Sequence, residues 1–135
     1  MKPIEGISVD GSSRGNPGDS AYRGVDLKTG EILFDIRIGD STNNIAEFIG
    51  LTHAINYAIK NNYTKVYSDS VTAIAWVRNK KANTTLAKTP KTEKSLELVS
   101  KSEKYLMKLD INYMTYVEKW DTKKWGESPA DFGFK

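Results

Sequence analysis

The sequence predicts an α/β fold built around one mixed β-sheet that is covered by helices. Two observations carry this prediction. The first 40 residues contain three segments in which apolar and polar residues alternate, which is typical of an antiparallel meander. After them, helical spacing alternates with short apolar segments, and a strand–helix–strand crossover of this kind sets its two strands parallel in one sheet. We therefore expect five strands, three antiparallel and then two parallel additions, in the order βββαβααβα.

The strands are indicated by alternation and by turn residues. Ile7 and Val9 lie two positions apart in the first apolar segment. Lys28-Thr29-Gly30 is typical of a hairpin turn between the second and third segments, with glycine where a positive φ is needed. The fourth segment is short and apolar, and the fifth alternates again. The expected strands cover residues 4–10, 22–27, 32–38, 65–68 and 111–117.

The helices are indicated by apolar residues at intervals of three and four. Phe48, Leu51, Ile55 and Ile59 follow this spacing and predict a helix that begins near Asn44. Further helices are expected over residues 71–78 and 90–107, a short last helix from Ser128-Pro129, and loops over residues 80–90 and 120–126.

The composition limits the chemistry that is available. The chain has 135 residues, no cysteine and one histidine, His53. These counts exclude a disulfide scaffold, a thiol nucleophile, and zinc sites built on thiolates or on a histidine cluster. Catalysis must therefore use carboxylates, hydroxyls, lysine or a metal, and we expect His53 to be a surface or half-buried helix residue.

The length predicts a single domain over residues 1–135. No apolar run approaches the ~20 residues of a membrane span, and no signal peptide is visible at the start. We expect a cytoplasmic protein without membrane association. The net charge is +3, and residues 78–108 are rich in lysine. This stretch would suit a polyanionic partner, although a solvated helix face explains the same pattern.

Acidic residues occupy unusual positions in the chain. Asp10 and Asp69 each end an apolar strand, and Glu47 and Asp131 each lie in the first turn of a predicted helix. Glu127 precedes Asp131 by four residues. Taken singly, each acid is better explained by local structure than by function.

The local explanations are specific. Asn44 and Glu47 match the two ends of a capping box. Asp69 or Ser70 could cap the helix that follows, and Asp10 could form a turn. Each of these interpretations requires only a hydrogen bond between the side chain and backbone groups a few residues away.

The acids taken together favour a metal site. Asp10 and Asp69 end strands that we expect to be neighbours, so their carboxylates would lie at one edge of the sheet. Crowded carboxylates repel one another unless a cation holds them. Oxygen ligands without imidazole or thiolate select Mg²⁺ or Mn²⁺, and two such ions flanking a phosphodiester is a common use of this arrangement.

Four segments resemble the motifs of type 1 ribonuclease H, in the family's order and spacing over nearly the whole chain. The closing segment is similar to the bacterial branch in which a glutamate replaces a mobile active-site histidine. The resemblance implies a ribonuclease H-like fold, with helices on both faces of the sheet, and covers the catalytic domain only. The segments are VDGSSRGNPG (residues 9–18), TNNIAE (42–47), YSDS (67–70) and KWDTKKWGESPAD (119–131).

The resemblance implies a metal-dependent endoribonuclease that cuts the RNA strand of RNA–DNA hybrids and leaves 5′-phosphate and 3′-hydroxyl ends. Asp10, Glu47, Asp69 and Asp131 match the carboxylates that bind two Mg²⁺ ions, with Mn²⁺ as the other candidate metal. Glu127 matches an accessory catalytic acid associated with product release.

The resemblance also implies contacts with the hybrid. Gly15, Asn16 and Asn43 match groups near the minor groove, where the family senses ribose 2′-hydroxyls. The matches to residues that hold the nucleic-acid backbone are Thr42, Asn44, Trp76, Thr84, Thr85, Lys119 and Thr122. Val71 departs from the pattern, because many members carry a glutamine there that touches the minor groove.

Two other functions remain open at this stage. One is a catalytically silent module that binds RNA–DNA hybrids, and the other is a DNA-acting nuclease on the same fold. The complete set of acids argues against the first, and the matches at Asn43, Asn44, Thr84 and Thr85 argue against the second. We expect a monomer without an obligate protein partner.

Overall fold

The computed structural model describes residues 1–131. Its sheet has five strands in the spatial order β3-β2-β1-β4-β5. β1, β2 and β3 pair antiparallel, β4 is parallel to β1, and β5 is parallel to β4, so the predicted mixed sheet is confirmed. The strands are β1 (Ile7–Ser13), β2 (Gly18–Asp26), β3 (Ile32–Ser41), β4 (Val66–Ser68) and β5 (Val117–Lys119).

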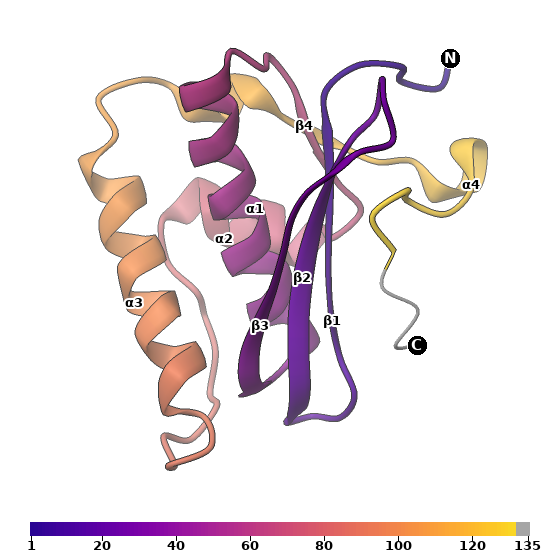
Figure 1. The fold of residues 1–135 in the computed structure, drawn as a ribbon. Coiled ribbons are helices and arrows are strands. Elements are labelled where there is room, and N and C mark those ends of the chain that lie inside the picture. The colour runs from indigo at the N-terminus through magenta and orange to yellow at the C-terminus, as the bar shows by residue number, and fades with distance from the viewer. Residues whose placement is uncertain (132–135) are drawn as a thin grey trace.

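Helices lie on both faces of this sheet (Figure 1). α1, α2 and α3 stand together on one side, and α4 with the last described residues lies on the other. Ser128 in that last segment is buried, and its hydroxyl is hydrogen-bonded to the hydroxyl of Ser8 on β1. The helices are α1 (Asn43–Asn61), α2 (Val71–Asn79), α3 (Glu93–Lys108) and α4 (Thr122–Trp125). None of them is both long enough and apolar enough to cross a membrane.

The core lies between β1 and α1. Ile7 and Val9 point from β1 into it, and Phe48, Leu51 and Ile55 fill it from α1. These three are the apolar positions at intervals of three and four that predicted the helix, because that spacing puts them on one helix face. Burial of this face therefore fixes both the position and the rotation of α1 over the sheet.

Gly11 lets α1 approach β1 closely. A Cβ atom added at Gly11 would lie 2.5 Å from the carbonyl carbon of Ala46 and 2.6 Å from the amide nitrogen of Glu47. Both are backbone atoms and cannot rotate away. The packing distance between the helix and the strand therefore depends on the absence of a side chain at this position.

The first strand differs from the expected one. It covers Ile7–Ser13 rather than residues 4–10, so Asp10 lies inside the strand, paired with Arg23 of β2, and does not form a turn. The serines and glycine after Asp10 are typical of loops, but the antiparallel pairing with β2 continues as far as Ser13.

The segment from residue 111 to 125 also differs. Residues 113–116 form a 3₁₀ helix, and only Val117–Lys119 pairs with β4. The expected strand over 111–117 is wrong because the buried Tyr113 is held under α2, where its hydroxyl donates to the carbonyl of Val77 at 2.6 Å.

The expected loop over residues 120–126 contains α4. Its N-cap is Asp121, whose carboxylate accepts from the backbone N–H groups of Lys123 and Lys124. The helix expected from Ser128-Pro129 is represented by a turn in which Asp131 N–H donates to the Ser128 carbonyl. Its continuation beyond Asp131 lies outside the described residues.

Replacement of Gly11 by alanine should destabilise the fold, because the new methyl group meets the backbone of α1. We expect Gly11→Ala to lower the free energy of unfolding by about 1–3 kcal/mol, the range typical of overpacking. Urea denaturation followed by circular dichroism measures this change.

Gly30→Ala is the control for glycine substitution itself. Gly30 has φ +77° in the hairpin, with no atom within 4 Å of an added Cβ, so only backbone strain of about 1 kcal/mol should appear. A Gly11→Ala protein as stable as the wild type would contradict the packing argument.

Candidate active site

Three carboxylates from separate elements meet at one place. Asp10 lies on β1, Glu47 lies on α1, and Asp69 follows β4 directly. Each offers an oxygen, and these oxygens all lie within 4.8 Å of one another. The parallel register explains the first pair, because Val9 is aligned with Ser68 and Asp10 and Asp69 therefore occupy the next position on neighbouring strands.

Local hydrogen bonds leave these acids available. The capping-box interpretation of Asn44 and Glu47 is wrong, because Thr42 is the N-cap of α1 and accepts from Ile45 N–H. One oxygen of Glu47 instead accepts a hydrogen bond from Gly11 N–H. α2 is capped by Ser70, which accepts from Ala73 N–H at 3.0 Å, so Asp69 is not the cap.

Burial makes the cluster electrostatically costly. Asp10 is 2% exposed and Glu47 is 8% exposed. Burial raises the pKa of Glu47 well above its ordinary value, and Asp10, as hydrogen-bond partner and as negative charge, and then Asp69 raise it further. The Gly11 N–H acts in the opposite direction by stabilising the charged form.

The donor set fits a hard divalent cation. All its ligand atoms are carboxylate oxygens, and two of the three carboxyl groups are buried where mutual repulsion is poorly screened. A bound cation would remove this repulsion. A cluster of this composition is therefore suited to Mg²⁺ or Mn²⁺ rather than to zinc.

The two acids near the end of the chain are placed differently. Asp131 is half-buried and does not belong to the group of three, and Glu127 is exposed. The segment that carries them is attached to β1 through the contact between Ser128 and Ser8, two residues before Asp10 on the same face of the strand. The structure thus directs the end of the chain toward the acids without bringing Asp131 into the cluster.

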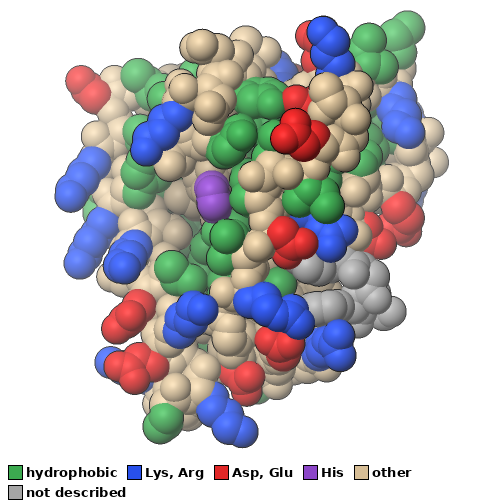
Figure 2. Space-filling model, viewed as in Figure 1, with side chains coloured by type: hydrophobic (Ala, Val, Ile, Leu, Met, Phe, Trp, Pro, Cys, Tyr) green, Lys and Arg blue, Asp and Glu red, His purple; other side chains and the backbone are tan. Residues whose placement is uncertain are grey.

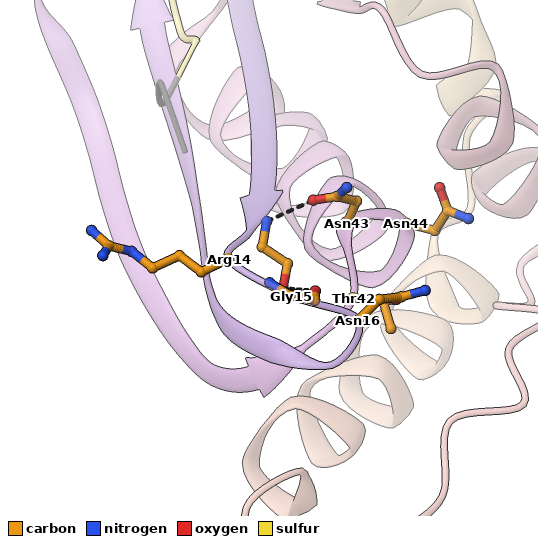
Figure 3. Close-up of a pocket in the computed structure, with 7 residues that line it drawn as sticks. Arg14, Gly15, Asn16, Thr42, Asn43 and Asn44 are labelled. Atoms are coloured by element: carbon orange, nitrogen blue, oxygen red, sulfur yellow. Dashed lines mark hydrogen bonds between the residues drawn. The ribbon is translucent and has the colours of Figure 1, made fainter. Parts of the chain in front are cut away.

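The acids lie in one of two adjoining hollows. The first, of about 240 Å³, contains the three carboxylates, and Asn43 and Asn44 form one of its sides. The same two asparagines line a second hollow of about 390 Å³ (Figure 3). The asparagines at the start of α1 therefore connect the acids to a longer polar groove. The second hollow is also lined by Ser13, Arg14, Gly15, Asn16 and Thr42.

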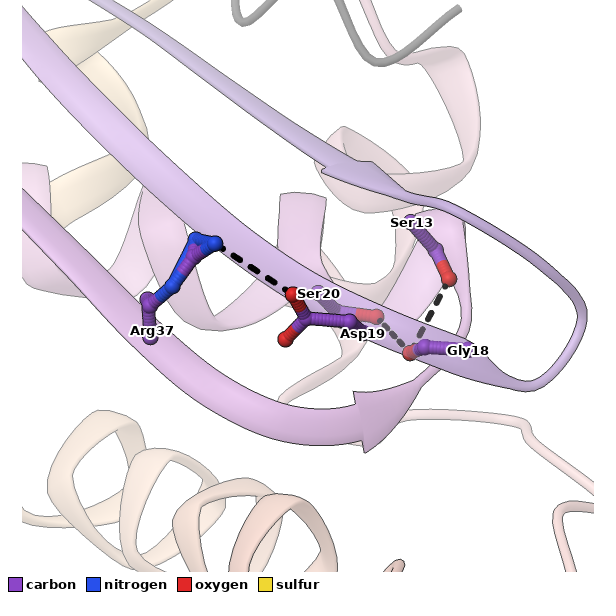
Figure 4. Close-up of polar contacts among 5 residues, drawn as sticks. All are labelled: Ser13, Gly18, Asp19, Ser20 and Arg37. Atoms are coloured by element: carbon purple, nitrogen blue, oxygen red, sulfur yellow. Dashed lines mark hydrogen bonds and ion pairs between the residues drawn. The ribbon is translucent and has the colours of Figure 1, made fainter.

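Fixed backbone surrounds this groove. The amide oxygen of Asn43 accepts from Ser13 N–H at 2.6 Å, which ties the start of α1 to the end of β1. Gly18 accepts from the hydroxyls of Ser13 and Ser20, at 3.2 and 2.7 Å, and Arg37 pairs with Asp19 on the neighbouring strand (Figure 4). The turn that carries Gly15 and Asn16 therefore starts and ends on restrained residues.

The other predicted contact residues lie on three elements. Trp76 on α2 is partly buried with its ring 6.0 Å from that of Phe48, so it combines core packing with partial exposure. Lys119 and Thr122 are exposed at β5 and α4. Thr84 and Thr85 lie in the loop between α2 and α3.

This loop, residues 80–92, is fixed at its two ends. Ala82 N–H donates to the carboxylate of Glu103 on α3 at 2.8 Å. At the other end, Thr92 Oγ1 donates to the Ala87 carbonyl and accepts from Thr89 N–H. Thr84 and Thr85 are thus held near α3 by a contact that sequence patterns did not reveal.

Four residues that line the two hollows were not predicted from the sequence. Ser13 and Arg14 line the larger hollow, and Gly11 and Ser70 line the smaller one. All four lie inside segments that carry the family resemblance, so their position next to the assigned residues was an available signal. Val71, two residues after Asp69, is 70% exposed.

The chain belongs to the RNase H family. The family model matches residues 5–131, which contain the acids and both hollows. The cluster of three acids and the two hollows therefore lie within the part of the chain that matches the family.

Solved structures show the same architecture. RNase H1 from the halophilic archaeon Halobacterium salinarum NRC-1 is 21% identical and aligns over 87% of this chain and 86% of that chain, with a TM-score of 0.50. The PFV RNase H domain is 17% identical over 88% and 78%, also with a TM-score of 0.50. The N-terminal RNase H domain of a Mycobacterium tuberculosis protein is 24% identical over 85% and 86%, with a TM-score of 0.49. The first two similarities establish the fold.

Glu47→Gln should stabilise the metal-free protein at neutral pH. The pKa of Glu47 is raised in the folded state, so its contribution to stability is fully present below about 4.5 and is lost as the pH rises through the raised value. Glutamine removes the charge and keeps the oxygen that accepts from Gly11 N–H. Thermal unfolding in EDTA should show a higher Tm, by about 2–8 °C for each kcal/mol gained.

The exposed Glu97 on α3 supplies the matched control, since Glu97→Gln changes the same charge away from the cluster. Addition of Mg²⁺ or Mn²⁺ should raise the Tm of the wild type and of Glu97→Gln more than that of Glu47→Gln. An unchanged or lower metal-free Tm for Glu47→Gln would show that the acids do not repel one another.

Proposed function

We propose that this chain is a metal-dependent endoribonuclease that hydrolyses the RNA strand of RNA–DNA hybrids and leaves 5′-phosphate and 3′-hydroxyl ends. The observation that carries the proposal is the group formed by Asp10, Glu47 and Asp69 at one end of a polar groove. Membership of the RNase H family supports the same chemistry.

The metal-binding residues of the proposal are Asp10, Glu47, Asp69 and Asp131. Two bound Mg²⁺ or Mn²⁺ ions would supply an activated water and neutralise charge on the leaving oxygen. The protein orients the ligands of these ions through two contacts. Gly11 N–H fixes one oxygen of Glu47, and Ser70 caps α2 so that the Asp69 carboxylate remains available. Asp131 would join the group from the segment attached to β1 through Ser128.

The polar groove is the proposed path of the hybrid. Gly15, Asn16 and Asn43 border it and would contact the minor groove, where ribose 2′-hydroxyls distinguish RNA from DNA. Amide groups suit this role because they both donate and accept hydrogen bonds. The proposed contacts with the backbone of the hybrid are Thr42, Asn44, Trp76, Thr84, Thr85, Lys119 and Thr122.

The remaining assignments belong to the same proposal. Glu127 is exposed, as an acid that assists product release must be. Its presence supports placement in the bacterial branch in which glutamate stands for the mobile histidine. We also propose that residues 1–135 form a single catalytic domain that acts as a cytoplasmic monomer.

Cleavage of a labelled RNA–DNA hybrid in Mg²⁺ tests the proposal directly. The wild type should cut only the RNA strand and should stop when EDTA is added. RNA–RNA and DNA–DNA duplexes of the same sequence should remain intact. Binding of the hybrid without cleavage in both Mg²⁺ and Mn²⁺, or cleavage of the DNA duplex, would overturn it.

Asp10→Asn should abolish this cleavage while the fold remains, because the amide keeps the shape of the side chain and loses the charge that holds the metal. We expect the cleavage rate to fall at least about 100-fold. This is more than is typical when a residue that only hydrogen-bonds to a metal ligand is replaced. Asp110→Asn is the control, since Asp110 is exposed after α3 and should retain full activity. Circular dichroism verifies that both variants are folded, and substantial activity in a folded Asp10→Asn protein would remove Asp10 from the metal site.

A further inference from the structure

A hollow of about 250 Å³ lies between α1 and α3, on the opposite side of α1 from the acids. At about 100° per residue, Ile49, His53 and Asn56 are roughly 180–240° around the helix axis from Glu47. The hollow is therefore separated from the candidate active site by the thickness of the helix. None of the residues assigned to the metal or the hybrid lines it.

His53 is held in a defined orientation beside this hollow. Its Nδ1 lies 2.6 Å from the hydroxyl of Tyr22, and its ring stacks on Phe34 with centroids 4.0 Å apart and an interplanar angle of 9°. Burial raises the pKa of Tyr22 to about 12 and lowers the pKa of His53. Tyr22 therefore keeps its proton and the imidazole is neutral. We take the Tyr22 hydroxyl as the donor to Nδ1, which places the imidazole's own hydrogen on Nε2.

The stacking on Phe34 depends on a glycine. A Cβ atom at Gly24 would lie 2.3 Å from the Phe34 ring, so the ring can occupy its place over β2 only because Gly24 has no side chain. Figure 2 shows the imidazole, in purple, reaching the surface among hydrophobic side chains. The protein thus builds a rigid aromatic support that presents one polar N–H group to the hollow.

Thr52 in the lining donates its hydroxyl to the Phe48 carbonyl, whereas three other polar side chains of the hollow have no partner among the described residues. The side chains of Asn56 and Lys101 and the hydroxyl of Ser102 make no hydrogen bond or ion pair there, and Glu97, one turn before Lys101, is not paired with it. No carboxylate of the described residues lines the hollow. Its charge is therefore positive, and its hydrogen-bonding capacity suits an acceptor.

The remaining walls are apolar. Ile49 and Leu98 line the hollow together with the rings of Tyr22 and Tyr105. Binding an apolar surface against these walls is favourable, because it removes apolar area from water. A ligand that fills the hollow must therefore combine a negatively charged acceptor group with an apolar body.

We propose that this hollow binds a small organic anion with an aromatic body, such as an aryl carboxylate or an aryl phosphate. The anionic group accepts hydrogen bonds from His53 Nε2–H and Lys101, and the ring lies against Leu98 and Tyr105. The site is independent of the proposed nuclease activity, because it uses none of the same residues.

Titration with benzoate and with phenyl phosphate, followed by NMR, tests the site. His53 is the only histidine of the chain, so its imidazole signals need no separate assignment. We expect saturable shifts of these signals with a Kd of about 1 mM, a typical value for a ligand of this size. Benzamide and inorganic phosphate, which each lack one half of the proposed ligand, should bind at least about fivefold more weakly.

Lys101→Gln should weaken binding of both aryl anions at least about fivefold. Lys104→Gln is the matched control, because Lys104 is exposed on the same helix but does not line the hollow. Absence of saturation, equal weakening in the two variants, or equally tight binding of inorganic phosphate or benzamide would overturn the proposal.

Discussion

The contact between α1 and β1 at Gly11 is the constraint on which the rest of the structure depends. Here the helix lies close enough for Gly11 N–H to reach the side chain of Glu47. The same contact sets the depth of Phe48 and Leu51 in the core and the position of the asparagines that begin α1. One backbone-to-backbone approach therefore fixes the core and the candidate site at once.

The acids illustrate a conflict between stability and function. Folding buries Asp10 and Glu47 beside each other, although their charges repel, and burial raises the pKa of Glu47. Apolar residues in these places would make a more stable fold. Strain of this kind is expected where a protein has been selected to bind a cation, and family membership points the same way.

Most of the architecture could be predicted from local patterns. The spacing of Phe48, Leu51, Ile55 and Ile59 identified α1, and the crossover rule placed Asp10 next to Asp69, because both signals reflect burial that dominates the energy of folding. Caps and short elements were harder. Thr42 rather than Asn44 caps α1, and a difference of two residues in a polar segment changes no apolar pattern.

The prediction for residues 111–125 was wrong for a related reason. Its alternation resembles a strand, but Tyr113 is held by a carbonyl of α2, a partner 36 residues away that no local pattern contains. The three clustered acids were anticipated as part of a set of four, of which Asp131 lies outside the cluster. The contact between Glu103 and Ala82 and the hollow beside His53 arise only from tertiary packing.

The anchoring of the loop between α2 and α3 has a consequence for how this surface can diversify. Glu103 secures the loop at Ala82, and the threonines that precede α3 secure it again from Ala87. The residues between these two attachments span a gap whose ends are already fixed, so a change in their length costs little closure entropy. The scaffold can therefore accept a different sequence or length in this segment without rebuilding the core.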